Sequence, residues 1–226
     1  MIRIVTWNCC RGKPEIKLPR LLKRKPDVVA IQECAQPQAL TQGTCAWYGD
    51  NRHQGVLALA LNRFRVEPIT RRRTLAKFFF PTRVIGTVAF NLLVVWAKPH
   101  LRTRKYLDSL YRGIEVYRDF IESDDTVILG DFNSAAYFGE GHLRFVDMLR
   151  EEFGLFSAYH EYHSLNHGDE THYTYFDRTK KGKPYHIDYC FVPHSWLRRL
   201  KRVTVGKHNE WADLSDHVPL VIEISR

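Results

Sequence analysis

Short apolar runs, rich in β-branched residues, recur along nearly the whole chain and alternate with polar or turn-forming residues. Continuous apolar runs of this length are typical of strands buried on both faces. The predicted strands are Ile2–Trp7, Pro26–Gln32, Gly55–Leu61, Val84–Phe90, Leu92–Ala97, Thr126–Leu129, His186–Val192, Val203–Val205 and Val218–Ile224. None approaches the roughly 20 apolar residues that cross a bilayer, so the sequence predicts no membrane span.

A different periodicity predicts an amphipathic helix over Thr103–Ser123. Its apolar residues step by three and four positions and share one helical face; they are Leu107, Leu110, Ile114, Tyr117 and Ile121. Further helices are predicted over His142–Glu152, Ser195–Leu200 and Ile16–Lys25, the last ended by Pro26. Strands interspersed with helices favour an α/β fold, with two mixed β-sheets packed face to face and helices outside. Because no stretch resembles a linker, residues 1–226 are predicted to form a single domain.

Composition bears on partners and compartment. The formal net charge of +9 favours a polyanion such as nucleic acid or an anionic membrane surface, or reflects only a basic surface. The five cysteines lack zinc-type spacing, so free thiols and a reducing compartment are expected. The N-terminal MIRIVTWN begins with a strand pattern and has no apolar signal-peptide core, which predicts a cytoplasmic location.

Acid, amide and imidazole side chains stand at the ends of several predicted strands, where an α/β protein usually forms its site. They are Asn8, Glu33, Gly130-Asp131-Phe132-Asn133, Ser215-Asp216-His217 and, inside an apolar run, His186-Ile187-Asp188-Tyr189. Taken alone, each cluster also fits an ordinary turn, cap or solvated strand end. Their common placement in one chain favours a shared site.

The spacing within two of these clusters predicts which side chains lie together. Asp131 and Asn133 are two residues apart, so in extended geometry both point to one side, and His186 and Asp188 share a face by the same rule. An ionised Asp188 inside an apolar strand needs a charge or hydrogen-bond partner. His217 is the candidate partner.

In this order the clusters resemble the endonuclease/exonuclease/phosphatase superfamily, which includes exonuclease III-like repair nucleases, pancreatic-type deoxyribonucleases, neutral sphingomyelinases and inositol phosphatases. The matching stretches are Thr6-Trp7-Asn8, Ile31-Gln32-Glu33, Gly130-Asp131-Phe132-Asn133, His186-Ile187-Asp188-Tyr189 and Ser215-Asp216-His217. The resemblance implies a four-layer α/β sandwich with its site at one end of two central sheets.

The resemblance also implies a role for each site residue. Glu33 would be the main metal carboxylate, helped by Asn8 and Asp216. Asp131 would orient or deprotonate the attacking water. The remaining roles are that Asn133 holds that water or a phosphate oxygen, His217 donates to a non-bridging phosphate oxygen, and Asp188 holds His217 in its tautomer.

The donor types independently suit a hard, oxygen-seeking ion. Carboxylates and amides without thiols favour Mg²⁺, for which Mn²⁺ could substitute. Such an ion would act as a Lewis acid and neutralise developing charge.

One part of the chain departs from the family pattern. Many members carry a histidine in the strand before the long helix, where this chain reads LLVVWA, with Trp96 or Ala97 near the expected place. His100 lies just beyond and is either a substitute or a surface loop histidine. The family's repair nucleases use a tyrosine near the leaving group instead, and Tyr106 is the candidate counterpart, with a core tyrosine as the alternative.

Basic and aromatic residues bear on the substrate. Arg71, Arg72 and Arg73 precede Lys77 and Phe78-Phe79-Phe80, which fits either phosphate contact with base stacking or a basic loop beside a core strand. Further positive charge near the predicted mouth comes from Arg102, Arg104, Lys105, Lys180, Lys181 and Lys183. Between Tyr159 and Phe176, four histidines at irregular spacing favour a loop at the rim of the site over a zinc site.

The sequence therefore predicts a metal-dependent hydrolase of phosphodiester bonds, a nuclease acting on DNA or RNA, that works as a monomer. The alternatives are a phosphodiesterase or phosphatase for a small or lipid phosphate ester, and a non-catalytic nucleic-acid-binding module. The complete catalytic set argues against the last, because binding alone would not require it.

Overall fold

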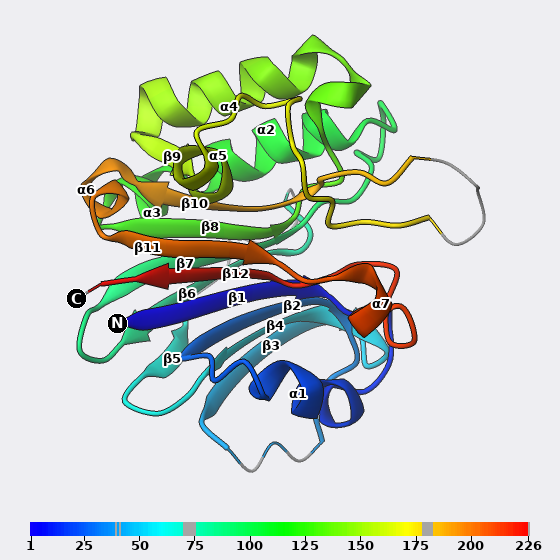
Figure 1. Ribbon diagram of the computed structural model, residues 1–226, viewed down its shortest axis with the longest axis vertical. Coiled ribbons are helices and arrows are strands. Elements are labelled where there is room, and N and C mark those ends of the chain that lie inside the picture. The colour runs from blue at the N-terminus through cyan, green and yellow to red at the C-terminus, as the bar shows by residue number, and fades with distance from the viewer. Residues whose placement is uncertain (39, 41, 70–75, 178–182, 226) are drawn as a thin grey trace.

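The protein is a four-layer α/β sandwich, in which two six-stranded mixed sheets pack face to face between helices (Figure 1). The computed structural model describes residues 1–38, 40, 42–69, 76–177 and 183–225. One sheet has the strand order β11-β12-β1-β2-β4-β3, and the other has the order β5-β6-β7-β8-β10-β9. Each contains one parallel pair, β1 with β2 and β7 with β8, among antiparallel neighbours.

The strands of the first sheet are β1 (Ile2–Asn8), β2 (Val28–Cys34), β3 (Thr44–Asn51), β4 (Gln54–Ala60), β11 (Leu200–Val205) and β12 (Leu220–Ile224). The strands of the second sheet are β5 (Arg65–Pro68), β6 (Phe79–Ile85), β7 (Phe90–Trp96), β8 (Thr126–Asp131), β9 (Leu155–Ser157) and β10 (Asp188–Pro193).

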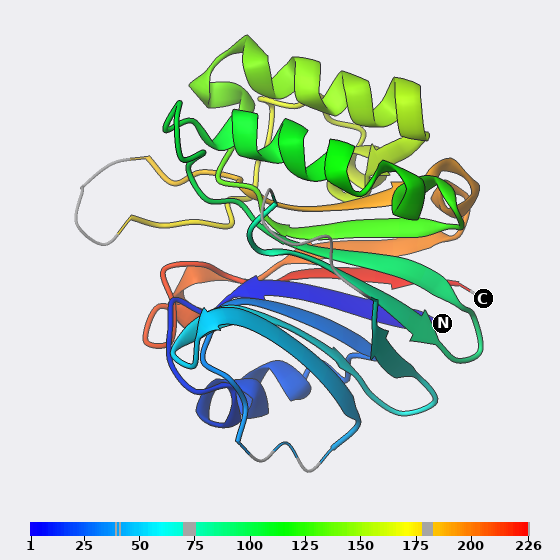
Figure 2. The ribbon, with the colours of Figure 1, turned by 180° about the vertical axis from the view of Figure 1, so that it is seen from behind.

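Helices α2 (Tyr106–Val116), α3 (Arg118–Glu122) and α4 (Glu140–Phe153) cover the second sheet, as both ribbon views show (Figure 2). Helix α5 (Ala158–His163) lies at the β9–β10 edge of that sheet and also contacts β11 of the first sheet. Helix α1 (Pro14–Leu22) and the short α7 (His208–Trp211) lie on the first sheet. A 3-10 turn, η1 (Ala136–Phe138), follows β8, and α6 (His194–Leu197) follows β10. Within the described residues, no helix is long and apolar enough to span a membrane.

The predicted fold class is confirmed, but several element boundaries were wrong. The predicted strand Val84–Phe90 contains the turn between β6 and β7, because β6 begins earlier, at Phe79. The predicted helix Thr103–Ser123 begins at Tyr106 and is divided at Tyr117, whose φ of −109° and ψ of 18° are not helical. Strands β3, β5 and β9 and helices α5 and α7 were not predicted.

Three apolar layers hold the sandwich together. The central layer lies between the sheets and includes Ile4, Val94, Trp96 and Leu129, which alternate with residues facing outward. The second layer lies under α2, α3 and α4, and the third lies under α1 and α7. Burial of apolar surface at about 25 cal/mol per Å² is the main force that fixes the two sheets against each other.

This packing brings the polar ends of strands from both sheets together. β1, β2 and β8 run in a common direction, so Asn8, Glu33 and Asp131 lie at one end of the sandwich. β10 runs antiparallel to β8 with Asp188 opposite Asp131, so it begins where β8 ends. The site is therefore assembled from both sheets.

Candidate active site

Asn8 joins the two sheets at the centre of the site. Its Nδ2 donates to Glu33 Oε1 at 3.2 Å and to Asp131 Oδ2 at 2.8 Å, while its Oδ1 accepts from the backbone N–H of Cys10 at 2.9 Å. The side chain is buried, so these hydrogen bonds fix its amide. An amide that donates to two carboxylates holds their oxygens in one place without adding charge.

Glu33 is aimed by a β-bulge that the sequence pattern does not reveal. The register of β2 against β4 shifts between Gln32 and Cys34, and Glu33 has a left-handed φ of 63°. A bulge redirects a side chain, and a left-handed non-glycine residue costs about 1–3 kcal/mol, which is typical of functional positions. Gln54, which was not predicted, donates from Nε2 to Glu33 Oε2 at 3.2 Å.

Asp131 and Asn133 lie together, but not for the expected reason. Asn133 has a left-handed φ of 48° and lies outside β8, so the extended geometry predicted for this pair was wrong. Its Nδ2 donates to Asp131 Oδ2 and its backbone N–H donates to Asp131 Oδ1, both at 2.9 Å. Gly130 is required just before them, because a Cβ there would lie 1.8 Å from the carbonyl oxygen of Val95.

His217 and Asp188 form a buried pair, with 2.8 Å between His217 Nδ1 and Asp188 Oδ2. The turn before β12 positions the histidine, since Ser215 accepts from the His217 N–H at 3.0 Å and donates to the Asn8 carbonyl at 2.7 Å. Burial opposes the charge on His217, but the neighbouring Asp188, with Asp131 and Asp216, raises its pKa to about 9. At neutral pH the imidazole is therefore protonated and able to donate from Nε2.

The pKa of Asp131 is also raised, but in a carboxyl group this shift favours the neutral form. Burial first, and then the charge of Asp188, raise the pKa of Asp131 to about 7, against the lowering effects of His217 and the donors from Asn8 and Asn133. A carboxyl group with a pKa near neutrality exchanges a proton readily at that pH, as a general base must.

Asp216 lies next to Cys10, which is in the chain that leaves β1. Burial of the Cys10 thiol, followed by the charge of Asp216 and a hydrogen bond with it, raises the pKa of Cys10. The charge of Glu33 acts on the same thiol. Glu33, Asn8 and Asp216 therefore surround the same small region.

Tyr106 stands at the start of α2 and is 37% exposed, so the alternative of a core tyrosine was wrong. Burial, and then the charges of Asp131 and Glu33, raise its pKa, which keeps the phenol protonated. Tyr106 is thus close enough for the charges of Asp131 and Glu33 to act on its hydroxyl group.

Two neighbouring residues were missed by the sequence analysis. The Nζ of Lys98 lies 3.4 Å from the ring centre of Trp96, and burial lowers its pKa despite the charges of Glu33 and Asp131. The ring of Tyr175 lies 4.8 Å from that of His217. Lys98 could have been found by the same rule as Asn8, because it is the first charged residue after a buried strand.

The position of the family's histidine is filled by core residues. Trp96 and Ala97 are buried, and the carbonyl of Ala97 accepts from Asn133 Nδ2 at 3.3 Å. His100 is a loop residue, because its Nδ1 faces the backbone N–H groups of Arg102 and Thr103 at 3.4 and 3.5 Å.

The substrate-facing predictions had mixed outcomes. Phe78, Phe79 and Phe80 are buried in the core, so base stacking by them was wrong and the core-strand alternative is correct. Arg102 is exposed. Arg71, Arg72, Arg73, Lys180 and Lys181 lie outside the described residues.

The prediction that His186 shares a face with Asp188 was wrong. It precedes β10, and its ring packs against those of Tyr159 at 4.4 Å and Tyr189 at 5.0 Å on the helix-covered side of the second sheet. The irregular backbone at residues 186 and 187 breaks the alternation on which that prediction depended.

The donors around Asn8 suit a divalent cation of the magnesium class. They are the carboxylate oxygens of Glu33 and Asp216 and the Oδ1 of Asn8, which also accepts from the backbone N–H of Cys10, and the neighbouring imidazole of His217 is protonated. Oxygen donors with room for water are what Mg²⁺ prefers.

Comparison with known proteins gives a consistent result. A model described as the endonuclease/exonuclease/phosphatase family matches residues 5–217. The fold is similar to that of a 3′ phosphatase from Neisseria bound to a product DNA hairpin, with 20% identity and a TM-score of 0.75, covering 100% of both chains. It is similar to an AP endonuclease from Archaeoglobus fulgidus, with 17% identity and a TM-score of 0.78, again covering 100% of both chains. No curated protein matches the sequence.

Proposed function

Because the chain belongs to the endonuclease/exonuclease/phosphatase family, we propose that it is a metal-dependent hydrolase that cleaves phosphodiester bonds in DNA or RNA. The observation that carries this proposal is the meeting of a protonated imidazole, a carboxyl group titrating near neutrality and a carboxylate–amide cluster at one end of the sandwich. Both sheets contribute to that site, which supports the proposal that residues 1–226 act as one domain.

Glu33, Asn8 and Asp216 are the proposed metal ligands, with Mg²⁺ as the natural ion and Mn²⁺ as a substitute. The ion would supply Lewis-acid stabilisation of charge on the phosphate. The bulge at Glu33 and the hydrogen bond from Gln54 hold the principal carboxylate before any ion arrives. Such preorganisation lowers the reorganisation needed during the reaction.

The other residues act on protons and hydrogen bonds. Asp131 orients the attacking water and accepts its proton, and Asn133 holds the water or a phosphate oxygen. His217 donates from Nε2 to a non-bridging oxygen as negative charge builds there, and Asp188 holds the imidazole by its Nδ1. Tyr106, whose raised pKa keeps it protonated, donates to the leaving oxygen.

Several observations favour nucleic acid as the substrate. The net charge of +9 favours a polyanion. Lys98 lies in the field of Glu33 and Asp131, and Arg102 is exposed in the segment before α2. The solved structures with similar folds include a 3′ phosphatase bound to a DNA hairpin and an AP endonuclease. We further propose a cytoplasmic monomer, in line with the free cysteines.

A substrate screen tests this proposal. We expect Mg²⁺- or Mn²⁺-dependent cleavage of labelled single- or double-stranded nucleic acid, abolished by a chelator, with binding that weakens steeply as salt rises, because each phosphate contact releases counterions. Small phosphodiesters and a lipid phosphodiester run beside it as competitors. Faster turnover of a small or lipid ester, with little response to salt, would establish the alternative substrate class.

The variant Arg71→Ala/Arg72→Ala/Arg73→Ala tests whether these three arginines bind phosphates or only add to the net positive charge of the protein. If these arginines bind phosphates, the slope of log affinity against log salt should flatten by about one unit for each arginine–phosphate interaction that the variant removes. An unchanged slope in this variant would show that the arginines do not bind phosphates and only add to that charge.

Lys98 is proposed to contact the scissile phosphate, because its ammonium group is held over Trp96 beside the carboxylates of the site. Lys98→Met, which keeps most of the unbranched side chain but removes the ammonium group, should lower kcat/KM by about 10–100-fold, the loss expected for one charged contact. The control is Lys77→Met, which removes an exposed lysine paired with Asp50. Equal activity in both variants would show that Lys98 does not contact the scissile phosphate.

A further inference from the structure

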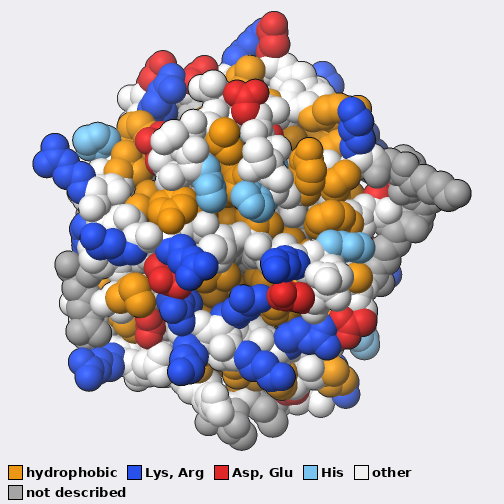
Figure 3. Space-filling view, viewed as in Figure 1, with side chains coloured by type: hydrophobic (Ala, Val, Ile, Leu, Met, Phe, Trp, Pro, Cys, Tyr) orange, Lys and Arg blue, Asp and Glu red, His pale blue; other side chains and the backbone are white. Residues whose placement is uncertain are grey.

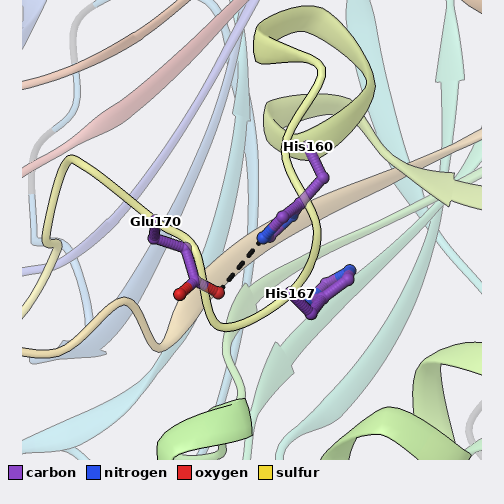
Figure 4. Close-up of side chains that lie close together, drawn as sticks. All are labelled: His160, His167 and Glu170. Atoms are coloured by element: carbon purple, nitrogen blue, oxygen red, sulfur yellow. Dashed lines mark hydrogen bonds and ion pairs between the residues drawn. The ribbon is translucent and has the colours of Figure 1, made fainter.

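A cluster of histidines lies on the helix-covered side of the second sheet, separate from the catalytic residues. His160 is in α5, and His167 and Glu170 follow in the segment after it (Figure 4). His142 of α4 and His186, which precedes β10, adjoin them. The function proposed above uses none of these residues.

Three of these side chains converge. One donor atom each from His160, His167 and Glu170 lies within 4.8 Å of the other two, and His160 Nε2 is 3.1 Å from Glu170 Oε1. In a tetrahedral zinc site with bonds of about 2.0–2.1 Å, neighbouring ligand atoms are about 3.3 Å apart. The present separations are thus within a small side-chain movement of that geometry.

The outer nitrogens of both histidines already have partners that suit a bound metal. His160 Nδ1 is 2.7 Å from the hydroxyl of Ser157, which can donate or accept and so allows either tautomer. His167 Nδ1 is 3.1 Å from His142 Nε2, and His142 Nδ1 is 3.0 Å from the Ser134 hydroxyl. Ligating histidines usually donate their second N–H to such a group, which orients the ring.

His186 adds an independent observation. Its Nδ1 must donate to the carbonyl of His172 at 2.9 Å, because a carbonyl only accepts. Its Nε2 is buried and has no hydrogen-bond partner within the described part of the chain. In the neutral imidazole this nitrogen is therefore a buried acceptor without a donor among the described residues. Its ring centre lies 5.8 Å from that of His160, so the acceptor belongs to the same histidine cluster.

An entry path is present as well. His160 and His167 line a cavity of about 350 Å³ between α4, β9 and α5, whose other walls include Leu143, Phe156 and Leu165. Figure 3 shows histidine side chains reaching the surface over the region of α5. Solvent in this cavity can supply a further ligand.

We propose that His160, His167 and Glu170 bind a Zn²⁺ ion, with water from the cavity completing a tetrahedral shell. Two imidazoles and a carboxylate are a ligand set that Zn²⁺ takes in proteins, with water in the fourth position. The rings of His160 and His167 now stack at 3.5 Å and an interplanar angle of 19°, so binding tilts them toward a common point. The ion ties α5 and the segment after it to α4 through His142, and through Ser134 to the chain that follows Asn133. The irregular histidine spacing, which argued against zinc, is compatible with a site whose ligands come from a helix and the loop after it.

Calorimetric titration of the metal-stripped full chain with Zn²⁺ in excess Mg²⁺ tests the proposal. We expect one site per chain with a Kd on the order of 1 µM or tighter. At a zinc concentration about 100 times Kd, the Tm should rise by about 5–10 °C. His167→Ala and Glu170→Gln should each weaken binding at least tenfold, and Glu33→Gln should not.

The matched control is His163→Ala, because His163 belongs to the same helix and packs on Tyr159 but is not one of the three ligands. It should keep the zinc affinity. The absorption spectrum of the Co²⁺-loaded chain gives a readout that folding defects do not imitate, since tetrahedral coordination should vanish only in the ligand variants. Absence of binding in the wild-type chain, or loss of the site in Glu33→Gln with retention in Glu170→Gln, would overturn the proposal.

Discussion

Glu33→Gln should remove nearly all metal-stimulated hydrolysis while leaving the fold intact. Lewis-acid stabilisation is worth several kcal/mol, and each 1.36 kcal/mol is tenfold in rate, so the expected loss in kcat/KM is about 10³-fold. The substitution is gentle, because the glutamine Oε1 can still accept from Asn8 Nδ2, and Gln54 can turn its amide to present an oxygen. The measurements are turnover against Mg²⁺ concentration and the Tm of each protein.

The control for this experiment is Glu67→Gln, which removes an exposed carboxylate paired with Arg65 in β5. It should behave as the wild-type protein. If higher Mg²⁺ restores part of the rate in Glu33→Gln, the carboxylate acts through metal affinity. Full magnesium-stimulated turnover in Glu33→Gln at low Mg²⁺ would refute its assignment as the principal ligand.

Much of the site could be predicted from the sequence because it follows the ends of buried strands. Asn8 and Asp131 are 123 residues apart, yet each ends a run of apolar residues, and parallel packing brings such ends together. Asp188 and His217 were found by a different argument, because a charge inside an apolar strand needs a partner. Lys98 follows an equally clear strand but was overlooked in favour of His100, which the backbone of the following turn engages instead.

The backbone exceptions could not be predicted from periodicity. The bulge at Glu33 and the left-handed conformation of Asn133 depend on contacts with β4 and Asp131, which lie far away in sequence or arise only in the folded turn. Likewise, β3 and β5 lie at the edges of the sheets, where exposed residues interrupt any apolar run, and β9 is only three residues long. Propensity is weakest where pairing with a neighbour decides the structure.

The histidines after Tyr159 show a different limit of prediction from sequence. Their spacing argued for a loop at the rim of the site, but α5 and the following chain bring His160, His167 and Glu170 together. Sequence spacing excludes only those metal sites that belong to one regular element. A site built from a helix end and a loop has no fixed spacing, so only the folded chain reveals it.

Asp188→Asn should move the whole pH profile of hydrolysis to lower pH. The wild-type reaction needs Asp131 deprotonated and His217 protonated, so with pKa values of about 7 and about 9 it should proceed best between them. The charge of Asp188 raises both pKa values, so its removal lowers both. The His217 pKa should fall toward its ordinary value of 6.5, and the alkaline limb should fall with it. At pH 8 the expected loss in rate is ~10²–10⁴-fold, and at pH 6 it should be smaller.

The stability of the folded protein should also depend on pH, in the direction set by the raised pKa of His217. The folded pKa of His217 is raised, so the stability from its pairing with Asp188 is fully present below pH 6.5 and is lost as pH rises through about 9. Asp188→Asn removes that contribution, so its Tm deficit relative to the wild-type protein should be largest at acidic pH and should narrow above pH 9. Thermal denaturation of both proteins at several pH values measures this separately from activity.

The strictest test is whether His217 and Asp188 act as one unit. Asp188 reaches the substrate only through the imidazole, so once His217 is absent its removal should have little further effect. His217→Ala and the double variant His217→Ala/Asp188→Asn should therefore be almost equally impaired at pH 8, and neither should show the alkaline limb. Asp125→Asn is the control, because this carboxylate also accepts hydrogen bonds, from Ser195 and Trp196, at a distance from the site. If the two single losses multiply in the double variant, Asp188 acts on the reaction independently of His217, and the proposed relay from carboxylate to imidazole to phosphate is wrong.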